Sequence, residues 1–349
     1  MQKEKKRKMT KLSIQLLKFG QPNEAFGFTE LIIPEPLNDE VQISVERFGI
    51  NYADVMAREG NYREAPPLPC VLGYEVVGEI TKVGKDSPKE LIGKRVVAFT
   101  RFGGYSQSVN TKHFAVAEIG DYDGNKALCL ATQYVTAYYM SHVATTIQKG
   151  DKVLVHAAAG GVGTALIQLL KHKEVQIIAK TGSDSKIQYL KDLGVNHIVN
   201  YNKSDYTKQI KDILKNERVD VSFNPVAGST FKKDWKLLGC SGSLILFGGS
   251  ERSGKKWGLF STLNFVRKMG VIIPITLMMR SKSIIGVNML KVADFKPFVL
   301  QNCLKEVLRM AIEGELDPQV GGVYNAKEIS KAHEFLASGK STGKVVLEW

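Results

Sequence analysis

From about residue 152 the chain alternates between two hydrophobic periods. Short apolar runs at 152–157, 175–180, 196–201, 219–226 and 242–249 predict strands. The segments between them, such as ALIQLLKHK and SDYTKQIKDILKN, repeat apolar residues at helical spacing. Alternating strands and helices specify right-handed crossovers and a parallel sheet. Residues 150–250 therefore predict a doubly wound domain of the nucleotide-binding type.

The first 130 residues follow a different pattern. Short strand-like stretches, including LSIQLL, VQISVERF, YEVVGEITKVG and KRVVAFT, are broken by Pro and Gly, which predicts a mostly β domain of barrel type. From about Lys291 the pattern gives a helix, a loop with Pro318, another helix and a last strand, KVVLEW. A single strand cannot form a domain, so we expect it to return to the N-terminal β domain.

The segment HAAAGGVGTALIQLLK (156–171) contains a glycine loop between a predicted strand and a predicted helix. That context is the one in which glycines bind a dinucleotide. Gly160 and Gly161 are expected to permit a tight turn and close approach to a pyrophosphate, and Gly163 to let helix and strand pack. Glycine turns also occur for packing alone, but the further strand–helix units favour a coenzyme.

The end of the second strand bears on the choice of coenzyme. NAD enzymes place an acid about 20 residues beyond the loop to hold the ribose 2′-hydroxyl. Here the sequence has Lys180, Thr181, Gly182 and Ser183, then Lys186, with Asp184 as the nearby acid. An ammonium and hydroxyls suit a 2′-phosphate, so NADPH is favoured over NADH, with Ser183 and Lys186 as contacts. The alternative is that Lys186 is an ordinary exposed helix lysine.

The stretch from Gly150 to Lys171 resembles the signature of quinone oxidoreductases and zeta-crystallins, the zinc-independent branch of the medium-chain dehydrogenase/reductase superfamily. GINYADVMAREGNY (49–62), LGYEVVGEI, FNPVAG and TGKVVLEW agree with it, and 250–280 most resembles the synaptic-vesicle membrane protein subgroup. The resemblance implies an α/β fold: a GroES-like β-barrel-type domain (12–128 and 290–349), an inserted Rossmann domain with a doubly wound parallel sheet (129–289) and usually a dimer. Residues 1–11 are expected to be a flexible basic tail.

The same resemblance, together with the strand ends, implies a set of coenzyme contacts beside Ser183 and Lys186. They are Thr136 near the nicotinamide, Ala159, Gly160, Gly161, Val162 and Gly163 in the loop, Tyr201 near the adenine ribose, Asn224, Phe247 and Gly248 at strand ends, and Lys344 reaching a phosphate.

No metal site is expected. Asn51 and Tyr74 stand where zinc alcohol dehydrogenases carry a ligand Cys and a ligand His, the four cysteines lie far apart, and the six histidines show no ligand spacing. Without a Lewis acid, an acceptor that takes hydride readily is required, such as a quinone or a conjugated enone.

By resemblance, Asn51 and Tyr62 line the catalytic site and hold the developing oxyanion or deliver a proton. Turn chemistry for Asn51 and a structural role for Tyr62 are the competing interpretations. An enoyl-thioester reductase and a non-catalytic NADPH-binding protein, crystallin-like or vesicle-associated, stay open as alternative functions.

Composition refines this picture. The 349 residues carry 48 Lys+Arg against 35 Asp+Glu, a net charge of +13, of which +5 falls in residues 1–11. A frayed, solvated end explains such a tail better than a nucleic-acid arm. The apolar run at 269–279 contains Pro274 and is shorter than the ~20 residues of a membrane span. We expect it to be a core or homodimer-interface element, with peripheral membrane contact as the alternative, in a cytoplasmic protein.

Overall fold

A computed structural model describes residues 10–253 and 259–349. The chain divides into two compact units. The first comprises Met1–Thr132 and Val320–Trp349, and the second comprises Gln133–Gln319. Residues 1–9, which contain most of the predicted basic tail, lie outside the described residues.

The first unit is built on two sheets. A seven-stranded sheet has the order β15-β16-β3-β5-β6-β8, with β7 also paired to β3, and a three-stranded sheet has the order β2-β1-β4. Its strands are β1 (Thr10–Leu16), β2 (Phe26–Ile32), β3 (Glu40–Ile50), β4 (Cys70–Val71), β5 (Glu75–Val83), β6 (Arg95–Phe99), β7 (Ser108–Lys112), β8 (Val116–Glu118), β15 (Val320–Asn325) and β16 (Lys344–Glu348). Its helices are α1 (Pro22–Ala25), α2 (Tyr52–Arg58), α3 (Gly124–Cys129) and α13 (Ile329–Ala337).

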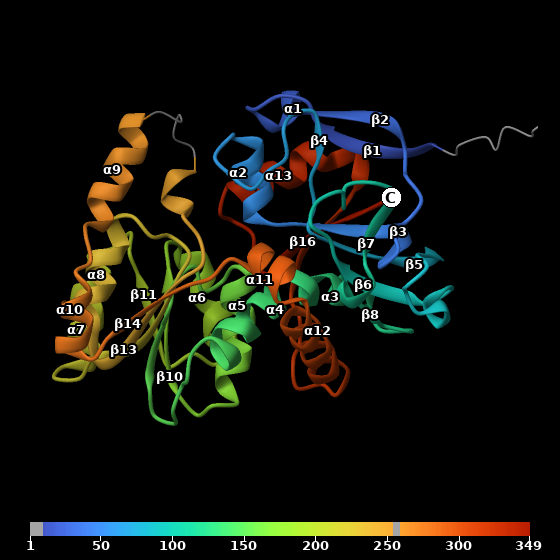
Figure 1. The fold of residues 1–349 in the computed structure, drawn as a ribbon. Coiled ribbons are helices and arrows are strands. Elements are labelled where there is room, and N and C mark those ends of the chain that lie inside the picture. The colour runs from blue at the N-terminus through green and yellow to red at the C-terminus, as the bar shows by residue number, and fades with distance from the viewer. Residues whose placement is uncertain (1–9, 254–258) are drawn as a thin grey trace, which may run out of the picture. The chain divides into compact units, whose positions relative to one another are not determined.

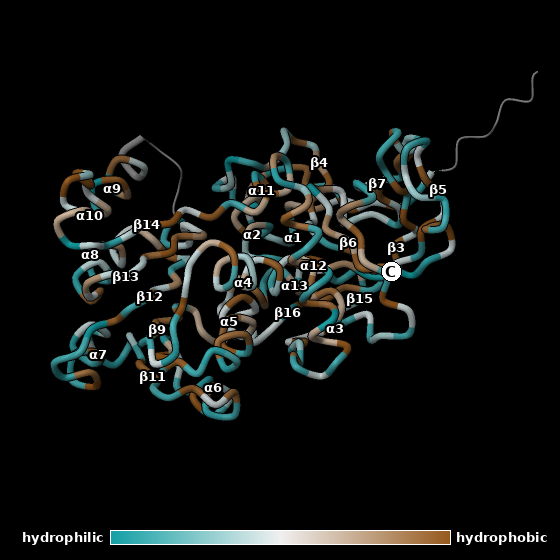
Figure 2. The backbone as a smooth tube through the Cα atoms, turned by 60° about the horizontal axis from the view of Figure 1, so that its bottom comes forward, coloured by the Kyte–Doolittle hydropathy of each residue, from teal (hydrophilic) through white to brown (hydrophobic). Residues whose placement is uncertain are grey.

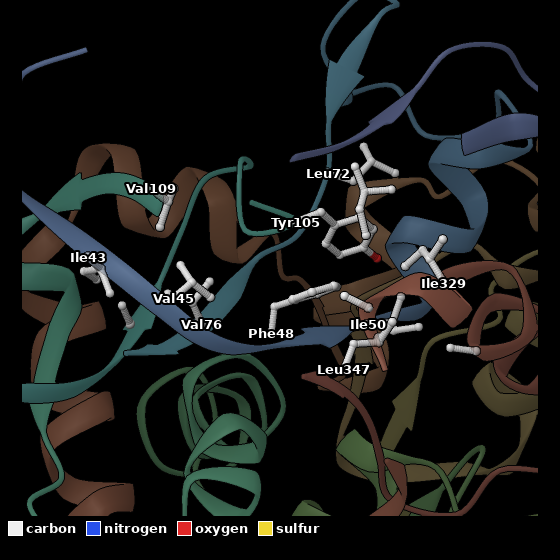
Figure 3. Close-up of a cluster of buried hydrophobic side chains, with 14 of the residues drawn as sticks. Ile43, Val45, Phe48, Ile50, Leu72, Val76, Tyr105, Val109, Ile329 and Leu347 are labelled. Carbon is white, nitrogen blue, oxygen red and sulfur yellow. The ribbon is translucent and has the colours of Figure 1, made fainter. Parts of the chain in front are cut away.

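The core of this unit gathers side chains from distant parts of the chain. Figure 3 shows Phe48 and Ile50 of β3 beside Leu347 of β16, with Tyr105 and Ile329 of α13 in the same cluster. The last strand pairs antiparallel with β3, as predicted, with Val346 opposite Gly49. Residues far apart in sequence therefore complete one β domain.

The second unit contains a six-stranded sheet in the order β11-β10-β9-β12-β13-β14, and all its strand pairs are parallel (Figure 1). These strands are β9 (Lys152–Val155), β10 (Gln176–Thr181), β11 (His197–Asn200), β12 (Val219–Asn224), β13 (Leu238–Leu246) and β14 (Ser283–Gly286). The order reverses between β9 and β12, which is the crevice where doubly wound sheets bind ligands. The predicted GroES-like and Rossmann architecture is confirmed.

Helices connect these strands and extend the unit beyond its predicted end. They are α4 (Val135–Tyr138), α5 (Gly161–Lys171), α6 (Ile187–Asp192), α7 (Tyr206–Leu214), α8 (Ser229–Leu237), α9 (Leu259–Met269), α10 (Pro274–Arg280), α11 (Met289–Phe295) and α12 (Pro297–Ile312). The boundary expected at 289/290 is corrected to 319/320, because α12 packs against α4 within the second unit. Helical periodicity reveals a buried face but not the domain against which that face packs.

The segment from α9 to α10 is apolar and exposed. The side chain of Val271 is 94% exposed and that of Met279 is 79% exposed, so the segment is not part of the core of this chain. Figure 2 shows hydrophobic residues along α9 and α10. Thr262–Arg280, 19 residues of mean hydropathy 1.3, meets the length and composition of a membrane span, which is weak support for one. α9 ends before Gly270, which has φ of 81°, and α10 begins at Pro274.

Candidate coenzyme and catalytic sites

The glycine loop joins β9 to α5 in the second unit. A Cβ at Gly163 would overlap the carbonyl oxygens of Ala157 and Ala158, so this position needs glycine for close packing of helix on strand, as predicted. A Cβ at Gly161 would overlap the side-chain amide of Gln133. The turn differs from the prediction, because Gly160 has φ of −80° and the left-handed residue is Ala157, with φ of 47°.

The remaining predicted role of Gly160 is to let the backbone approach a pyrophosphate closely. Around a Cβ built there, the contact is the carbonyl oxygen of Ala157 at 3.2 Å, so an alanine would fit the loop with a small adjustment. The N-terminus of α5, an 11-residue helix, begins directly after it. Free N–H groups and the positive end of the helix dipole suit a pyrophosphate at this point.

The turn after β10 carries the residues expected to select the coenzyme. Ser183 caps a short 3-10 turn, its hydroxyl oxygen accepting from the backbone N–H of Ser185 at 3.3 Å. Lys186 is partly buried, which lowers the pKa of its ammonium. Asp184 faces Lys203 at 3.0 Å and accepts from the Asn200 amide at 2.9 Å. These two partners lower the pKa of Asp184. The acid nearest to this strand end is therefore already engaged by Lys203 and Asn200.

Tyr201 follows β11 and lies over the same turn. A Cβ at Gly182 would overlap its phenol, so glycine is required for the ring to lie there. Half of the Tyr201 side chain is exposed. An aromatic face thus stands open beside Ser183 and Lys186, where the resemblance places the adenine ribose.

Lys180, at the end of β10, was not among the predicted coenzyme contacts. Its side chain is 5% exposed, and its Nζ donates to His156 Nδ1 at 3.1 Å. The ammonium also lies 4.8 Å from the centroid of the Tyr201 ring and 4.2 Å from that of Tyr206. The sequence signal was a lysine that directly follows the apolar run at 177–179, as the next-to-last residue of the strand.

A carboxylate stands behind the histidine. His156 Nε2 lies 2.8 Å from Asp234 Oδ2, and both side chains are fully buried. Asp234 also accepts from Tyr206 at 2.7 Å, Ser222 at 2.9 Å and Asn224 at 2.6 Å. Burial lowers the pKa of His156, so the imidazole is neutral, its proton faces Asp234 and its Nδ1 accepts from Lys180. The sequence showed only that His156 has no metal-ligand spacing and gave no sign of its pairing with Asp234.

The remaining predicted coenzyme contacts differ in burial and in whether their side chains already make hydrogen bonds. Asn224 is fully buried at the end of β12, where its Oδ1 accepts from the N–H groups of Val226 and Ala227. Thr136 lies in α4 and is 9% exposed. Phe247 and Gly248 directly follow β13. Because parallel strands end at one edge, Ala159 of the loop and Val162 in the first turn of α5 share that edge with Tyr201, Phe247 and Gly248. Their contacts with a coenzyme stay predictions.

In the first unit, Asn51 belongs to a buried ionic cluster with Glu75 and Lys344. The Asn51 amide donates to Glu75 Oε1 and Oε2 at 2.8 and 3.0 Å, and its oxygen accepts from Lys344 at 2.8 Å. Lys344 and Glu75 form an ion pair with no exposure. The ammonium of Lys344 is therefore engaged inside the β domain, and reaching a phosphate would require it to leave Glu75. The sequence pattern gave no sign of this pair.

Asp54 completes the surroundings of Asn51. Its carboxylate accepts from the backbone N–H of Asn51 at 2.7 Å and from that of Gly73 at 3.2 Å. Burial, with the negative charge of Glu75 adding to it, raises the pKa of Asp54 to about 7. Asn51 and Asp54 thus cap the start of α2, and Asn51 also belongs to the buried cluster with Glu75 and Lys344.

Tyr62 packs against Tyr74 in the first unit. The two ring centroids are 6.4 Å apart at 85°, an edge-to-face pair. Burial raises the pKa of Tyr62, so its phenol keeps its proton at neutral pH and can donate a hydrogen bond. Of the two predicted catalytic residues, Tyr62 has the partly exposed side chain, while the Asn51 amide donates inward to Glu75.

The donor set does not fit a zinc ion. Across residues 10–253 and 259–349, no group of three or more His, Cys, Asp or Glu side chains is placed to hold a metal ion. At the two positions that match zinc ligands by resemblance stand an amide, Asn51, and a phenol, Tyr74.

Comparison with known proteins places this geometry in a wider class. The family described as alcohol dehydrogenase GroES-like domain matches residues 37–144, and the zinc-binding dehydrogenase family matches residues 161–305. The fold and the loop are those of a dehydrogenase with a GroES-like domain.

Three relatives narrow the class. The synaptic vesicle membrane protein VAT-1 homolog of Homo sapiens is 29% identical over 90% of this chain and 80% of its own length. The quinone oxidoreductase of Rattus norvegicus is 28% identical over 96% of this chain and 97% of its own. The crystal structure of Escherichia coli quinone oxidoreductase complexed with NADPH has a TM-score of 0.84 at 26% identity, covering 97% of this chain and all of that one. The two family matches, which together span most of the chain, are those of the medium-chain dehydrogenase/reductase superfamily, and the similarity to quinone oxidoreductases is consistent with its quinone oxidoreductase branch.

Proposed function

We propose that this oxidoreductase binds NADPH on the second unit and reduces a quinone or a conjugated enone without a metal. The observation that carries the proposal is the edge of the parallel sheet. A glycine loop at the helix N-terminus, an open Tyr201 ring and the turn that carries Ser183 and Lys186 meet there, while Asp184 is engaged by Lys203 and Asn200. The NADPH complex of the E. coli relative supports the choice of coenzyme.

When bound, NADPH supplies a hydride, which with one proton converts a quinone to a hydroquinone or an enone to a ketone. The residues of the chain position the reactants and handle the proton. We assign Tyr62 as donor to the acceptor oxygen, because its phenol stays protonated at neutral pH. Asn51, whose amide is held by Glu75 and Lys344, is assigned to positioning α2 and its surroundings.

Stopped-flow single-turnover kinetics tests the activity. NADPH-loaded protein is mixed with a panel of quinones, conjugated enones and a crotonyl thioester, and NADPH oxidation is followed by absorbance. We expect oxidation with a quinone or enone, slowed by about 10²-fold or more in Tyr62→Phe. Tyr52→Phe, on the neighbouring helix α2 and 37% exposed, is the matched control and should keep the rate.

The panel also separates the alternatives. Faster turnover of the thioester, with the larger Tyr62→Phe defect on that substrate, would instead indicate an enoyl-thioester reductase. NADPH binding with no oxidation by any acceptor would indicate a non-catalytic binding protein, and the enzyme proposal would be wrong.

Two glycine variants test the coenzyme site. Gly160→Ala should fold, because its methyl group needs only a small shift of the Ala157 carbonyl oxygen, yet weaken NADPH binding by obstructing the pyrophosphate. Gly163→Ala should lower stability by about 1–3 kcal/mol through overlap with two carbonyl oxygens. Tryptophan fluorescence titration and thermal melting measure the two effects, and unchanged NADPH affinity in Gly160→Ala would contradict the assignment.

We further propose a cytoplasmic homodimer. The exposed apolar segment at α9–α10 precedes β14, which is the end strand in the order of its sheet. A second copy could cover both, since an unpaired strand edge and a large apolar surface favour association. Sedimentation of the full chain with and without Met279→Glu tests this, and vesicle flotation tests the alternative occupant, a membrane.

A further inference from the structure

The group that the proposed reaction leaves unused is the buried cluster of His156, Lys180 and Asp234. Burying an ammonium away from water is costly unless it is paired. Here its carboxylate, Asp234, is reached only through the neutral ring of His156. The charge of Lys180 is thus weakly compensated, and it stands at the strand end where coenzyme selection occurs.

Aromatic rings and titratable groups from several elements surround the ammonium of Lys180. They include His156 after β9, Tyr206 at the start of α7 and Asp234 of α8. Lys233 of α8 lies over the same Tyr206 ring at 5.4 Å and pairs with Asp205 at 2.6 Å. The ammonium also lies 4.8 Å from the centroid of the Tyr201 ring, and half of that side chain is exposed, so this ring links the buried charge to the surface.

We propose that Lys180 is a positioning and specificity residue for the coenzyme: it fixes the Tyr201 ring through a cation–π contact and supplies the buried positive charge by which the site prefers a 2′-phosphorylated dinucleotide. The inference rests on the proposed NADPH binding. Tyr201 is the surface that the coenzyme meets, and Lys180 acts through it. Lys186 and Ser183 remain the candidates for direct contact with the phosphate.

This arrangement makes the preference depend on pH. Burial, as the largest cause, lowers the pKa of Lys180 to about 8, against the attraction of Asp234. The ammonium is present below that pH and is lost above it. A bound phosphate dianion stabilises the ammonium, so NADPH binding near pH 8 should be accompanied by proton uptake. The phosphate itself, with a second pKa of about 6, does not titrate in this range.

The test is a set of NADPH and NADH titrations of the full-length protein between pH 7 and 9.5, followed by tryptophan fluorescence. In the wild type, the ratio of NADH to NADPH dissociation constants should fall as pH rises through 8. In Lys180→Met it should be about tenfold lower at pH 7 and independent of pH. Failure of the wild type to bind NADPH would defeat the proposed function itself and is seen before any variant is compared.

Two controls separate this role from neighbouring charges. Lys233→Met removes an equal charge that also lies over the Tyr206 ring and should keep the ratio at pH 7. Because the charge of Lys233 lowers the pKa of Lys180, the fall in the ratio should persist in this variant but move to a higher pH. Lys186→Met should weaken NADPH but keep the fall near pH 8. If Lys180→Met weakens both coenzymes equally, or keeps the wild-type ratio and slope, Lys180 is only a structural residue and the inference is wrong.

A measurement on the wild type alone guards against a variant that does not fold. Calorimetric titration at pH 8 in buffers of different ionisation enthalpy counts the protons taken up. NADPH should bind with net uptake and NADH with little or none. Equal proton counts for the two coenzymes would overturn the inference without any substitution.

Discussion

The two units bury a lysine and a carboxylate in different ways. In the first unit, Lys344 contacts Glu75 directly, with Asn51 bonded to both. In the second, the neutral ring of His156 stands between Lys180 and Asp234, and the ammonium lies against two aromatic rings. A direct pair compensates each charge and joins strands, whereas an interposed imidazole leaves a cation that can respond to a ligand. The same residue types therefore serve the fold in one unit and, as we propose, selectivity in the other.

The largest effect is expected when the direct pair is broken. Lys344→Met leaves the Glu75 carboxylate buried without its cation and should lower the free energy of unfolding by about 3–5 kcal/mol. Urea denaturation followed by circular dichroism measures it. The double variant Glu75→Gln/Lys344→Met should recover much of the loss, and a loss below about 1 kcal/mol in Lys344→Met would show that the pair does not stabilise the unit.

A second effect comes from Asp54, beside the direct pair. Its folded pKa of about 7 lies above the unfolded value of about 4, so the folded state holds the proton more tightly. The free energy of unfolding should therefore fall as pH rises from 4 to 7 and be level above 7. Between pH 5 and 7 we expect a fall of about 2 kcal/mol that Asp54→Asn lacks, measured by urea denaturation at each pH. Parallel pH profiles for the two proteins would argue against a raised pKa.

In the second unit, loss of one bond to the carboxylate should matter less. Tyr206→Phe removes the hydroxyl that donates to Asp234 at 2.7 Å but keeps the ring beside Lys180. We expect a loss of about 1.5 kcal/mol in thermal or urea unfolding, because three other groups still surround Asp234. A loss as large as that of Lys344→Met would remove the contrast between the two clusters.

The smallest effect belongs to the exposed pair at the edge of the second cluster. Lys233 and Asp205 lie 2.6 Å apart with about half of each side chain exposed, so solvent screens their attraction. Lys233→Met should change the free energy of unfolding by no more than about 0.5 kcal/mol. A larger loss in urea denaturation would mean that Lys233 supports Tyr206 through its ring contact rather than through charge.

Local sequence patterns predicted much of this fold and less of its chemistry. The β9–α5 loop and the alternating elements follow from periods and glycines that any reader of the sequence can see. The return of β16 also followed, because one strand cannot fold alone. The assignment of α12 to the second unit could not be predicted, since an apolar helix face does not reveal the domain against which it packs. The strand β14 was missed because a four-residue run gives little periodicity.

Within the sites, the glycines were predictable because their function is steric and local. The pairing of Lys344 with Glu75 and of His156 with Asp234 was not, because each joins residues that are brought together only by tertiary packing. Lys180 shows the limit most clearly. Its position at a strand end was visible in the sequence, whereas its burial between two rings required the folded structure.

The route of β16 has a consequence for synthesis on the ribosome. Lys344 follows Asn51 by 293 positions, so the cluster that joins the start of α2 to β5 and β16 cannot form until all the intervening chain has been translated. The second unit is continuous, from Gln133 to Gln319, and can complete its sheet earlier. During synthesis the β domain therefore lacks β16, a partner of β3, until the second unit has been translated.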